Sequence, residues 1–526
     1  MKHVKNLMLL FVALLLVAAG CSNNGEQSSS EGDAENKEQV LYFAIGGEVK
    51  DLDAHFLAGL PKYAVGPNIY NALVRFPMGT ADVENLEPDL AESWETNDDA
   101  TQWTFHLREG VQWHKDYGEL TAEDVKWSFE RVMDPENGIS HASNYTNVES
   151  IETPDDLTVV FHLKEPDPNF LTKVADYQGG YIVNKDAIEA NEVIGTGPFV
   201  FEEYKTQDSV TLVKNEKYFR GEPKLDKIVY KIMTDQTAID VAMEKGDIHI
   251  ALGSSDPLWV EEKSQNSDLI IEVGKPLNMA AFYLNTSKPP FDDIRVRQAF
   301  AHAIDVQKYV DTYIVEGVGQ VPQGLIPSDV VGAENVGNYE YNPEKAKQLL
   351  KEAGYEGGLD LPPQYVSQAP HILNPMLFAQ DQLKQVGINM PLEQIEHTTY
   401  QENMRKGMNN VSYVSLNRIP HVANWFKDLY YGPSSVGTPA GNVNYSHYSG
   451  SDDLIEQALV ETDPEKAEAL YKEIQQQMID AYPAVPLAEY GTTIVRRAEV
   501  NLGYNDNKHE GSLHYYIQID ENTFIE

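Results

Sequence analysis

Cysteine is almost absent from this sequence, since Cys21 is the single cysteine among 526 residues. One thiol cannot form an internal disulfide, and it cannot supply the several thiolates of a zinc or iron–sulfur site. A catalytic cysteine also needs a base held close to it, whereas Cys21 lies between an apolar run and a polar tract. The stability of the folded chain must therefore come from burial of apolar side chains alone.

Long apolar runs are also scarce. A membrane-spanning helix needs about 18 or more consecutive apolar residues, and no stretch of the chain reaches that length. The most apolar stretch is Leu7–Ala18, which follows Lys2 and Lys5 and precedes the small residues Ala19 and Gly20. A short positive segment, an apolar segment and small residues are the three parts of a secretory signal peptide.

The position of the cysteine directly after this segment resembles the lipobox of bacterial lipoproteins, with Ala18 where leucine is commonest. The resemblance implies that residues 1–20 are a lipoprotein signal peptide and that the sulfur of Cys21 carries a diacylglycerol; an ordinary cleaved signal is the alternative. Two acyl chains, at about 0.8 kcal/mol per buried methylene, make a durable anchor. We therefore expect a lipid-anchored protein on the extracytoplasmic face of the cell membrane. Residues 21–39, which are polar, then form a flexible tether of roughly 25 Å.

Positive charge is scarce as well, with 40 Lys and Arg against 82 Asp and Glu and a net charge of −42. Such a field repels nucleic acid and anionic lipid head groups, so we expect neither as a partner. Solubility in a salty or alkaline medium explains the acidity most simply. The hydrophobic content of 42% is that of a globular protein, and the length predicts two or three compact units.

The familiar catalytic and nucleotide-binding motifs are missing. The chain contains no G-x-S-x-G elbow, no Walker A loop and no G-x-G-x-x-G that opens a helix. His509 and His514 are five residues apart, not four, so they do not share the helix face that a zinc-binding H-E-x-x-H motif needs. We expect no enzyme activity, no cofactor and no metal.

Two further polar segments allow more than one interpretation. Asp51, Asp53 and His55 would share one face of an extended segment, where they could bind a metal, although a solvated strand end entering a cleft is favoured. Gly195-Thr196-Gly197 could form an anion-binding nest of backbone N–H groups, although a glycine hinge between sheet segments is favoured.

Strand and helix patterns alternate along the first half of the chain. Thr121 is expected to cap a helix whose apolar face contains Val125, Phe129 and Val132. The segments expected to form strands are 41–45, 103–107 and 157–163, followed by an antiparallel meander of 199–204, 209–214 and 227–233.

From residue 291 the pattern becomes helical. Ile294–Ile304 is expected to form a helix capped by Asp292 or Asp293, Asn342-Pro343 to start a second, and Asp463-Pro464 to start a third. The tail from residue 487 alternates again like strands. A strand-rich, helix-rich and strand-rich order suggests a first lobe built from both ends of the chain.

One segment carries a specific resemblance. TFHLREGVQWHKDYGELTAEDVKWSFERVMDP (104–135) resembles the signature region of the extracellular solute-binding proteins of family 5, the peptide- and nickel-binding subunits of ABC importers. The segments that follow the family in the same order are 195–232, 291–310, 341–355 and 462–487. His114-Lys115-Asp116-Tyr117 departs from the family, which more often has His-Asp-Gly there.

The resemblance implies an α/β fold of the periplasmic-binding-protein type, with two lobes that close on a ligand and an extra subdomain in the first lobe. The expected boundaries are 40–80, 194–289 and 488–526 for lobe I, 81–193 for its extra subdomain and 290–487 for lobe II. It further implies a monomeric, non-catalytic receptor that delivers its ligand to a membrane permease with separate ATPases. A surface hydrolase on the same fold is the alternative from another class.

The resemblance also points to a ligand site. Peptide-binding members carry roughly W-x-x-D-Y-P-D-P-x-N-F-L, whose tryptophan lines the pocket and whose first aspartate pairs with the peptide's α-amino group. The matching stretch SLNRIPHVANWF (415–426) has Ser415 in place of that tryptophan and Arg418 in place of that aspartate, with Trp425 as the aromatic near its end. Oligopeptides or dipeptides are the default ligands, yet Arg418 would repel an ammonium group and would instead hold a carboxylate.

A non-peptide anionic solute or a metal chelate is therefore the alternative ligand, unless Arg418 turns to solvent or pairs with an acid of the chain. The other candidate contacts come from positions expected to face the cleft between the lobes: Asp53, His55, Tyr283, Asn285 and His371.

Overall fold

The computed structural model describes residues 38–504 and 518–526, except 48, 50, 58, 140, 176–178, 255, 315–316 and 439–442. The predicted signal peptide, Cys21 and almost all of the tether lie outside the described residues, as do His509 and His514. Glu38–Glu526 forms one compact unit. Within the described ranges, no helix is long and apolar enough to cross a membrane.

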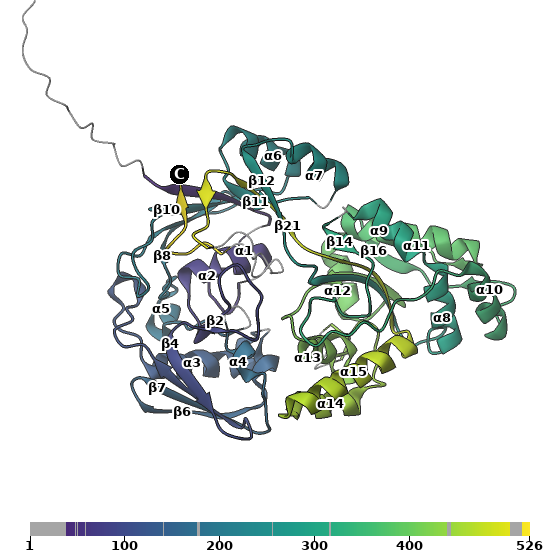
Figure 1. Ribbon diagram of the computed structural model, residues 1–526, viewed down its shortest axis with the longest axis horizontal. Coiled ribbons are helices and arrows are strands. Elements are labelled where there is room, and N and C mark those ends of the chain that lie inside the picture. Colours follow the sequence, from purple (N-terminus) through teal and green to yellow (C-terminus); the bar gives the residue numbers. More distant parts are fainter. Residues whose placement is uncertain are drawn as a thin grey trace, which may run out of the picture. The chain divides into compact units, whose positions relative to one another are not determined.

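A mixed sheet of seven strands organises the part of the chain that we call lobe I (Figure 1). Its strand order is β12 (Leu269–Val273), β21 (Thr493–Arg497), β11 (Ile250–Leu252), β1 (Val40–Ile45), β10 (Lys227–Ile232), β9 (Ser209–Lys214) and β8 (Phe199–Lys205). β1 pairs in parallel with β10 and β11, and β8, β9 and β10 form the predicted antiparallel meander. β21, which comes from the C-terminal part of the chain, lies between β11 and β12, so both ends of the chain contribute to this sheet.

A smaller antiparallel sheet is inserted into lobe I. Its strands are β4 (Ala91–Thr96), β5 (Gln102–Leu107), β7 (Thr158–Leu163) and β6 (Val148–Asp155). Helix α3 (Ala122–Met133) packs on β6 and β7 (Figure 1). Its Phe129 meets Phe161 edge to face at 5.0 Å between ring centroids. Thr121 and Asp124 form a capping box at its first turn, which confirms the predicted helix start.

Lobe II is built on a second sheet of four strands. Their order is β14 (Gly319–Gln320), β20 (Ala484–Tyr490), β13 (Asn278–Leu284) and β19 (Val411–Leu416), and all pairs are antiparallel. Two short parallel pairs extend this lobe: β16 (Gln364–Ser367) with β18 (Leu392–Ile395), and β15 (Leu359–Asp360) with β17 (Ile388–Asn389).

Helices surround the strands of lobe II. They are α8 (Ile294–Ala303), α9 (Val306–Tyr313), α10 (Pro343–Glu352), α11 (Pro370–Gln385), α12 (His397–Arg405), α13 (Val422–Trp425), the π-helical η4 (Phe426–Tyr430), η5 (Gly432–Ser434), α14 (Asp452–Val460) and α15 (Pro464–Ala481). The side chains of Asp293, Asn342 and Asp463 accept hydrogen bonds from the first turns of α8, α10 and α15, so these three predicted starts are confirmed.

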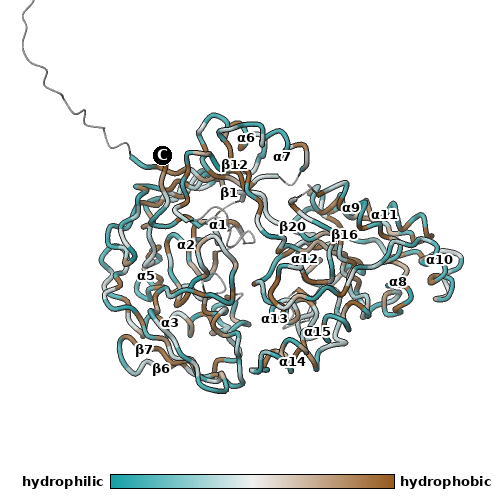
Figure 2. Tube along the Cα trace, in the orientation of Figure 1, coloured by the Kyte–Doolittle hydropathy of each residue, from teal (hydrophilic) through white to brown (hydrophobic). Residues whose placement is uncertain are grey.

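The remaining elements belong to lobe I. They are α1 (Gly59–Ala64), α2 (Gly66–Ile69), β2 (Val74–Arg75), β3 (Glu87–Pro88), η1 (His114–Asp116), η2 (Pro135–Asn137), η3 (Ala142–Tyr145), α4 (Phe170–Lys173), α5 (Lys185–Ala190), α6 (Gln236–Lys245), α7 (Pro257–Lys263), β22 (Val500–Asn501) and β23 (Phe524–Ile525). The strands of both lobes carry much of the apolar core, while the outer helices alternate apolar and polar residues (Figure 2).

Within the described residues the chain crosses between the lobes twice, and the two crossings lie side by side. One leads from β12 to β13 and the other from β20 to β21. The backbone N–H of Gly274 donates to the carbonyl of Thr492 at 3.1 Å, and a Cβ atom on Gly491 would lie 1.8 Å from the carbonyl oxygen of Gly274. Only glycine allows this approach, so the crossings form a compact two-stranded connection.

Gly195 and Gly197 also have a packing reason. A Cβ atom on Gly195 would lie 1.9 Å from the carbonyl oxygen of Ile69, and the N–H of Gly197 donates to that oxygen at 2.9 Å. The Gly195 N–H meets Nδ1 of His114 at 3.3 Å. Because both N–H groups are used within the fold, the glycines form no anion-binding nest. They serve the close approach of two backbone segments, and no hinge is needed to explain them.

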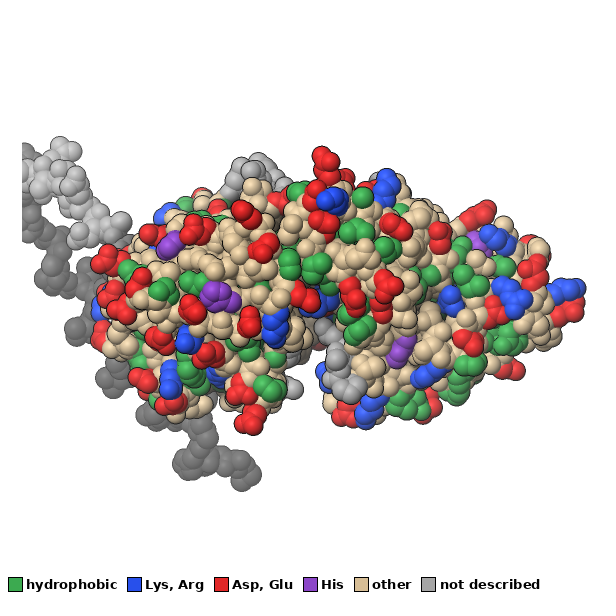
Figure 3. All heavy atoms as spheres, turned by 90° about the horizontal axis from the view of Figure 1, so that it is seen from below, with side chains coloured by type: hydrophobic (Ala, Val, Ile, Leu, Met, Phe, Trp, Pro, Cys, Tyr) green, Lys and Arg blue, Asp and Glu red, His purple; other side chains and the backbone are tan. Residues whose placement is uncertain are grey.

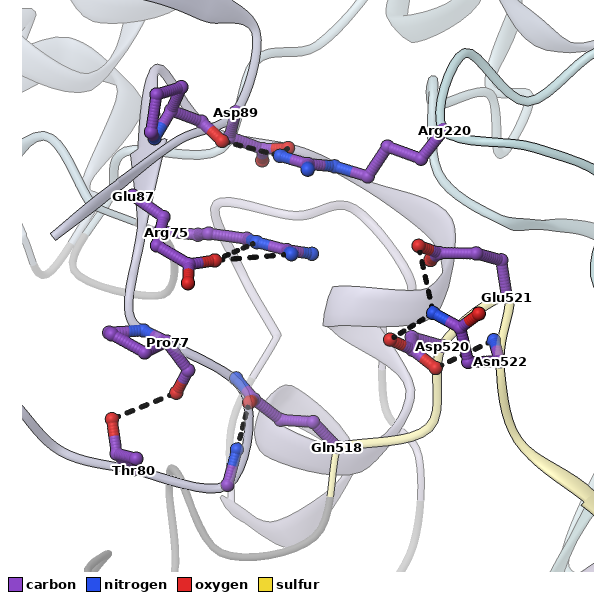
Figure 4. Close-up of polar contacts among 12 residues, drawn as sticks. Arg75, Pro77, Thr80, Glu87, Asp89, Arg220, Gln518, Asp520, Glu521 and Asn522 are labelled. Carbon is purple, nitrogen blue, oxygen red and sulfur yellow. Dashed lines mark hydrogen bonds and ion pairs between the residues drawn. The ribbon is translucent and has the colours of Figure 1, made fainter. Parts of the chain in front are cut away.

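The C-terminal residues are held in lobe I by polar contacts (Figure 4). Gln518 accepts a hydrogen bond from the backbone N–H of Gly79 at 3.0 Å, and the carbonyl of Glu521 accepts one from Lys224 at 3.1 Å. Nearby, Arg220 forms an ion pair of 3.0 Å with the buried Asp89.

Candidate functional site

Arg418 follows strand β19 and forms an ion pair. Its Nε lies 2.7 Å from Oδ2 of Asp428, and its Nη1 donates to the carbonyl of Asn417 at 2.7 Å. The Arg418 and Asp428 side chains are 23% and 26% exposed. Of the arrangements expected for Arg418, the structure therefore shows pairing with an acid of the chain, in a position that solvent still reaches.

Asp428 comes from the π-helical turn η4, directly after Lys427. Burial lowers the pKa of Lys427, and the nearby cation Lys173 of the insert in lobe I lowers it further, whereas Asp428 and Asp167 raise it. Lys173 and Asp167 form an ion pair with each other in the insert. Because Lys427 feels the charges of the other lobe, η4 lies on the face of lobe II that is turned toward lobe I.

The positive charge of Arg418 acts on two buried tyrosines, Tyr283 and Tyr445. Tyr283 on β13 is fully buried, and its ring centroid lies 6.1 Å from that of Tyr445 and 6.3 Å from that of Tyr430. Burial raises the pKa of both Tyr283 and Tyr445, and the positive charge of Arg418 acts in the opposite direction on both. Arg418 therefore lies close enough to this tyrosine cluster for its charge to act on Tyr283 and Tyr445.

Ser415 stands at the edge of this site, where the peptide-binding pattern has tryptophan. Its hydroxyl contacts the hydroxyl of Tyr490, the last residue of β20 before the chain crosses to lobe I. Ser415 is exposed and Tyr490 half-buried. The serine therefore makes a polar contact between β19 and the end of β20.

In lobe I, Asp53 and His55 meet the same arginine, Arg131 of α3. Its Nη2 lies 2.5 Å from Oδ2 of Asp53, and its Nη1 donates to Oδ1 of Asp53 at 3.0 Å and to Nδ1 of His55 at 2.7 Å. His55 Nε2 lies 3.0 Å from the carbonyl oxygen of Tyr181, to which it donates when Nδ1 accepts. Burial lowers the pKa of His55 to about 4, so the imidazole is neutral at pH 7.

This arrangement leaves few lone pairs for a metal, because Arg131 occupies those of Asp53 and His55 that face each other. Within the described ranges, no group of three or more His, Cys, Asp and Glu side chains is arranged to hold a metal ion. A cavity of about 360 Å³ adjoins the cluster and is lined in part by Asp51, Asp53 and Tyr70. Phe56, which is 40% exposed, stacks over Arg131 at 5.6 Å.

The other candidate residues lie apart from these two groups. Asn285 is buried and its Oδ1 accepts from the backbone N–H and hydroxyl of Ser287, at 3.1 Å and 2.7 Å, so it shapes the turn after β13. Trp425 is fully buried in lobe II. His371 is exposed in the first turn of α11, where burial and the neighbouring His397 lower its pKa. Contact of these residues with a solute stays a prediction.

Sequence reasoning missed Asp428 and Arg131. Asp428 lies ten residues after Arg418, with a short helix between them, and Arg131 lies far along the chain from Asp53. Neither spacing predicts a contact, because the fold alone brings the partners together. The surplus of acids was the one general signal that Arg418 would find a partner, and acidic side chains are scattered over the face shown in Figure 3.

A family model described as "Bacterial extracellular solute-binding proteins, family 5 Middle" matches residues 85–438. Among curated proteins, the chain is 28% identical to heme-binding protein A of Haemophilus influenzae, over 93% of this chain and 94% of that protein. It is 30% identical to the dipeptide-binding protein of Escherichia coli, over 82% of this chain and 86% of that protein.

Two solved structures are similar over nearly the whole chain. The binding protein MoaA of A. tumefaciens R10, solved with mannopinic acid, has a TM-score of 0.84 and 32% identity, over 93% of this chain and 100% of that one. DppA of Helicobacter pylori, solved with the peptide STSA, has a TM-score of 0.79 and 27% identity, over 93% and 98%. Both are two-lobed periplasmic binding proteins, so the predicted two-lobed α/β fold is confirmed.

Proposed function

Because this chain belongs to the bacterial extracellular solute-binding proteins of family 5, we propose that it is the receptor subunit of an ABC importer for a small carboxylate-bearing solute. Members of this family bind solutes and are not enzymes. The receptor captures its ligand outside the cytoplasm and delivers it to a membrane permease driven by separate ATPases. Lipidation of Cys21 holds the receptor at the extracytoplasmic face of the membrane.

The partly exposed guanidinium of Arg418 is the observation that carries the ligand class. A guanidinium remains protonated at any physiological pH and presents a planar fork that matches a carboxylate through two hydrogen bonds. Arg418 stands beside the tyrosine cluster and near the face of lobe II that is turned toward lobe I. The part of this fork that no protein group occupies can donate hydrogen bonds to a carboxylate.

The comparisons support two kinds of carboxylate-bearing ligand. Short peptides are one, since relatives include the dipeptide-binding protein of Escherichia coli and DppA solved with STSA. A non-peptide acid is the other, since MoaA was solved with mannopinic acid. Arg418 favours a ligand that presents a carboxylate to lobe II.

The test is mass spectrometry of the solute that co-purifies, followed by calorimetry on Arg418→Ala. Loss of the guanidinium should weaken binding by about 2–5 kcal/mol, because the bound carboxylate would lose its charged partner. Lys351→Ala, which removes an exposed cation of lobe II, is the control and should bind normally. Unchanged affinity of Arg418→Ala, or a co-purifying solute without a carboxylate, would contradict the proposal. A solute recovered chemically altered after incubation would favour the hydrolase instead.

A further inference from the structure

The Arg418–Asp428 pair has unused hydrogen-bonding atoms on both partners. An arginine has five N–H donors, and here Nη1 donates to the carbonyl of Asn417 while Nε faces Oδ2 of Asp428. In the parts of the chain that the structure describes, no protein group bonds to Nη2 of Arg418 or to Oδ1 of Asp428. Both side chains remain partly exposed, at 23% and 26%. The pair therefore offers a positively charged hydrogen-bond donor and a negatively charged hydrogen-bond acceptor side by side.

Lys427, the neighbouring cation, forms no ion pair with this acceptor within the described residues. It precedes Asp428 in η4, and the charges of Asp428, of Asp167 and of Lys173 all act on its pKa. The tyrosines on the other side of Arg418 carry no charge at pH 7, since burial raises the pKa of Tyr283 and Tyr445. Asp428 is thus the one anion paired with Arg418 within the described residues.

Building on the carboxylate-binding function proposed above, we propose that the solute carries a free α-amino-acid head group, whose carboxylate binds Arg418 and whose ammonium binds Asp428. In such a head group both charges sit on one carbon atom, so they match two protein groups that are themselves in contact. Charge-assisted hydrogen bonds of this kind are the strongest and the most dependent on geometry.

Ligands of simpler charge fit this pair less well. A lone carboxylate on Arg418 would face the negative charge of Asp428 without compensation. A linear α-linked peptide has its ammonium and its carboxylate on different residues, with Cα atoms about 3.8 Å apart even in a dipeptide. The solute class that fits is an amino-acid conjugate joined through its side chain, such as a γ-linked dipeptide.

Two isomers test this directly. γ-Glutamyl-alanine has a free α-amino-acid head group, whereas α-glutamyl-alanine has the same atoms and net charge but lacks that group. Calorimetry on the full-length receptor should show at least tenfold tighter binding of the γ-linked isomer. Equal binding, tighter binding of the α-linked isomer, or no binding of either would overturn the head-group assignment.

A thermodynamic cycle that combines Asp428→Asn with a change in the ligand shows whether Asp428 contacts the ligand directly or only positions Arg418. N-acetylation of γ-glutamyl-alanine removes the ammonium, and it should weaken binding to the wild-type protein at least tenfold but leave binding to Asp428→Asn nearly unchanged. Asp428→Glu should restore part of the preference for the free ammonium, and Asp453→Asn, on an exposed acid of α14, should behave as wild type.

If Asp428→Asn weakened both ligands equally, Asp428 would act only by positioning Arg418, and the proposal would be wrong. Thermal unfolding of each variant shows whether it is folded. The proposed function fails separately, since a co-purified carboxylate solute that depends on Arg418 but lacks an α-amino group would overturn only the head-group assignment.

Discussion

At the scale of single residues, charged side chains in this protein are largely held by partners that are distant in sequence. Arg131 joins Asp53 to His55, and Arg418 finds Asp428. Removing one partner of a buried ion pair leaves the other charge buried without a partner. Such contacts therefore constrain the fold even where they add little net stability. The two arginines differ in one respect: the atoms of Arg131 are engaged within the fold, whereas Arg418 keeps part of its guanidinium available.

A buried histidine leads to a prediction about pH. Burial lowers the pKa of His114 to about 4, and its Nε2 lies 3.0 Å from the carbonyl oxygen of Gly197. The unfolded chain binds this proton near pH 6.5 and the folded protein only near pH 4, so the free energy of unfolding should fall as the pH falls through that window.

His114→Gln should make the unfolding free energy less dependent on pH, by up to about 3 kcal/mol between pH 7 and pH 4. Urea unfolding of the variant and of wild type at both pH values measures the difference. The raised pKa values of Asp520 and Glu521 make the folded state more stable as the pH falls, which is opposite to the effect of His114. The pH dependence of the variant must therefore be compared with that of wild type. His106→Gln is the control. If the unfolding free energy of His114→Gln depended on pH as steeply as that of wild type, His114 would not be the source of this pH dependence.

At the scale of elements, helix starts and backbone contacts decide the local architecture. Caps at Asp293, Asn342 and Asp463 satisfy N–H groups that a helix leaves unpaired at its first turn. Glycine at Gly491 allows the two crossings between the lobes to touch. Both devices depend on single residues, so their contributions can be measured one at a time.

Gly491→Ala should destabilise the protein by at least about 2 kcal/mol, because the new Cβ atom would lie 1.8 Å from the carbonyl oxygen of Gly274. Denaturant unfolding measures the loss. Gly357→Ala is the matched control, since a Cβ atom there meets no atom within 4 Å, and it should be neutral or slightly stabilising. Equal stability of the two variants would show that the crossings can separate without penalty.

At the scale of the whole molecule, two lobes are joined by two adjacent crossings, an arrangement about which the lobes could close on a ligand. A ligand that touches both lobes stabilises the closed form by its differential affinity for that form. The charges around Lys427, Lys173 and Asp167 show that contacts between the lobes involve polar groups that water can also solvate. Such contacts form and break more readily than an apolar interface.

Small-angle scattering should therefore record a smaller radius of gyration when the solute is added to protein freed of its ligand. The expected change comes from rotation of the lobes, with their internal structure unchanged. A tight ligand confirmed by calorimetry that leaves the scattering curve unaltered would count against closure.

Attachment to the membrane gives a second prediction at this scale. Cys21→Ser removes the sulfur that we propose carries the lipid, so the protein should be released into the medium or remain uncleaved. Fractionation of the producing cells, with immunoblots of membrane and medium, distinguishes these results from wild type. A serine variant that is processed normally and stays on the membrane would disprove lipidation.

Much of the local structure could be predicted from sequence patterns alone. The meander of β8, β9 and β10, the capping box at Thr121 and the helix starts at Asn342 and Asp463 depend on short-range periodicity and on capping chemistry. Gly195 and Gly197 were recognised as special, but their packing against Ile69 could not be predicted, because that backbone segment lies far away in sequence.

The sequence by itself determined the class of the protein: an acidic chain without disulfides or catalytic motifs, with a lipobox-like start and family-5 segments in order. These properties are sums over residues or short local patterns, and they can be determined without knowledge of the fold. Only the tertiary structure decided that Arg418 lies against Asp428 and that His55 is buried beneath Arg131. Pairing and burial depend on which distant segments the fold brings together, and the charge that a ligand meets depends on both.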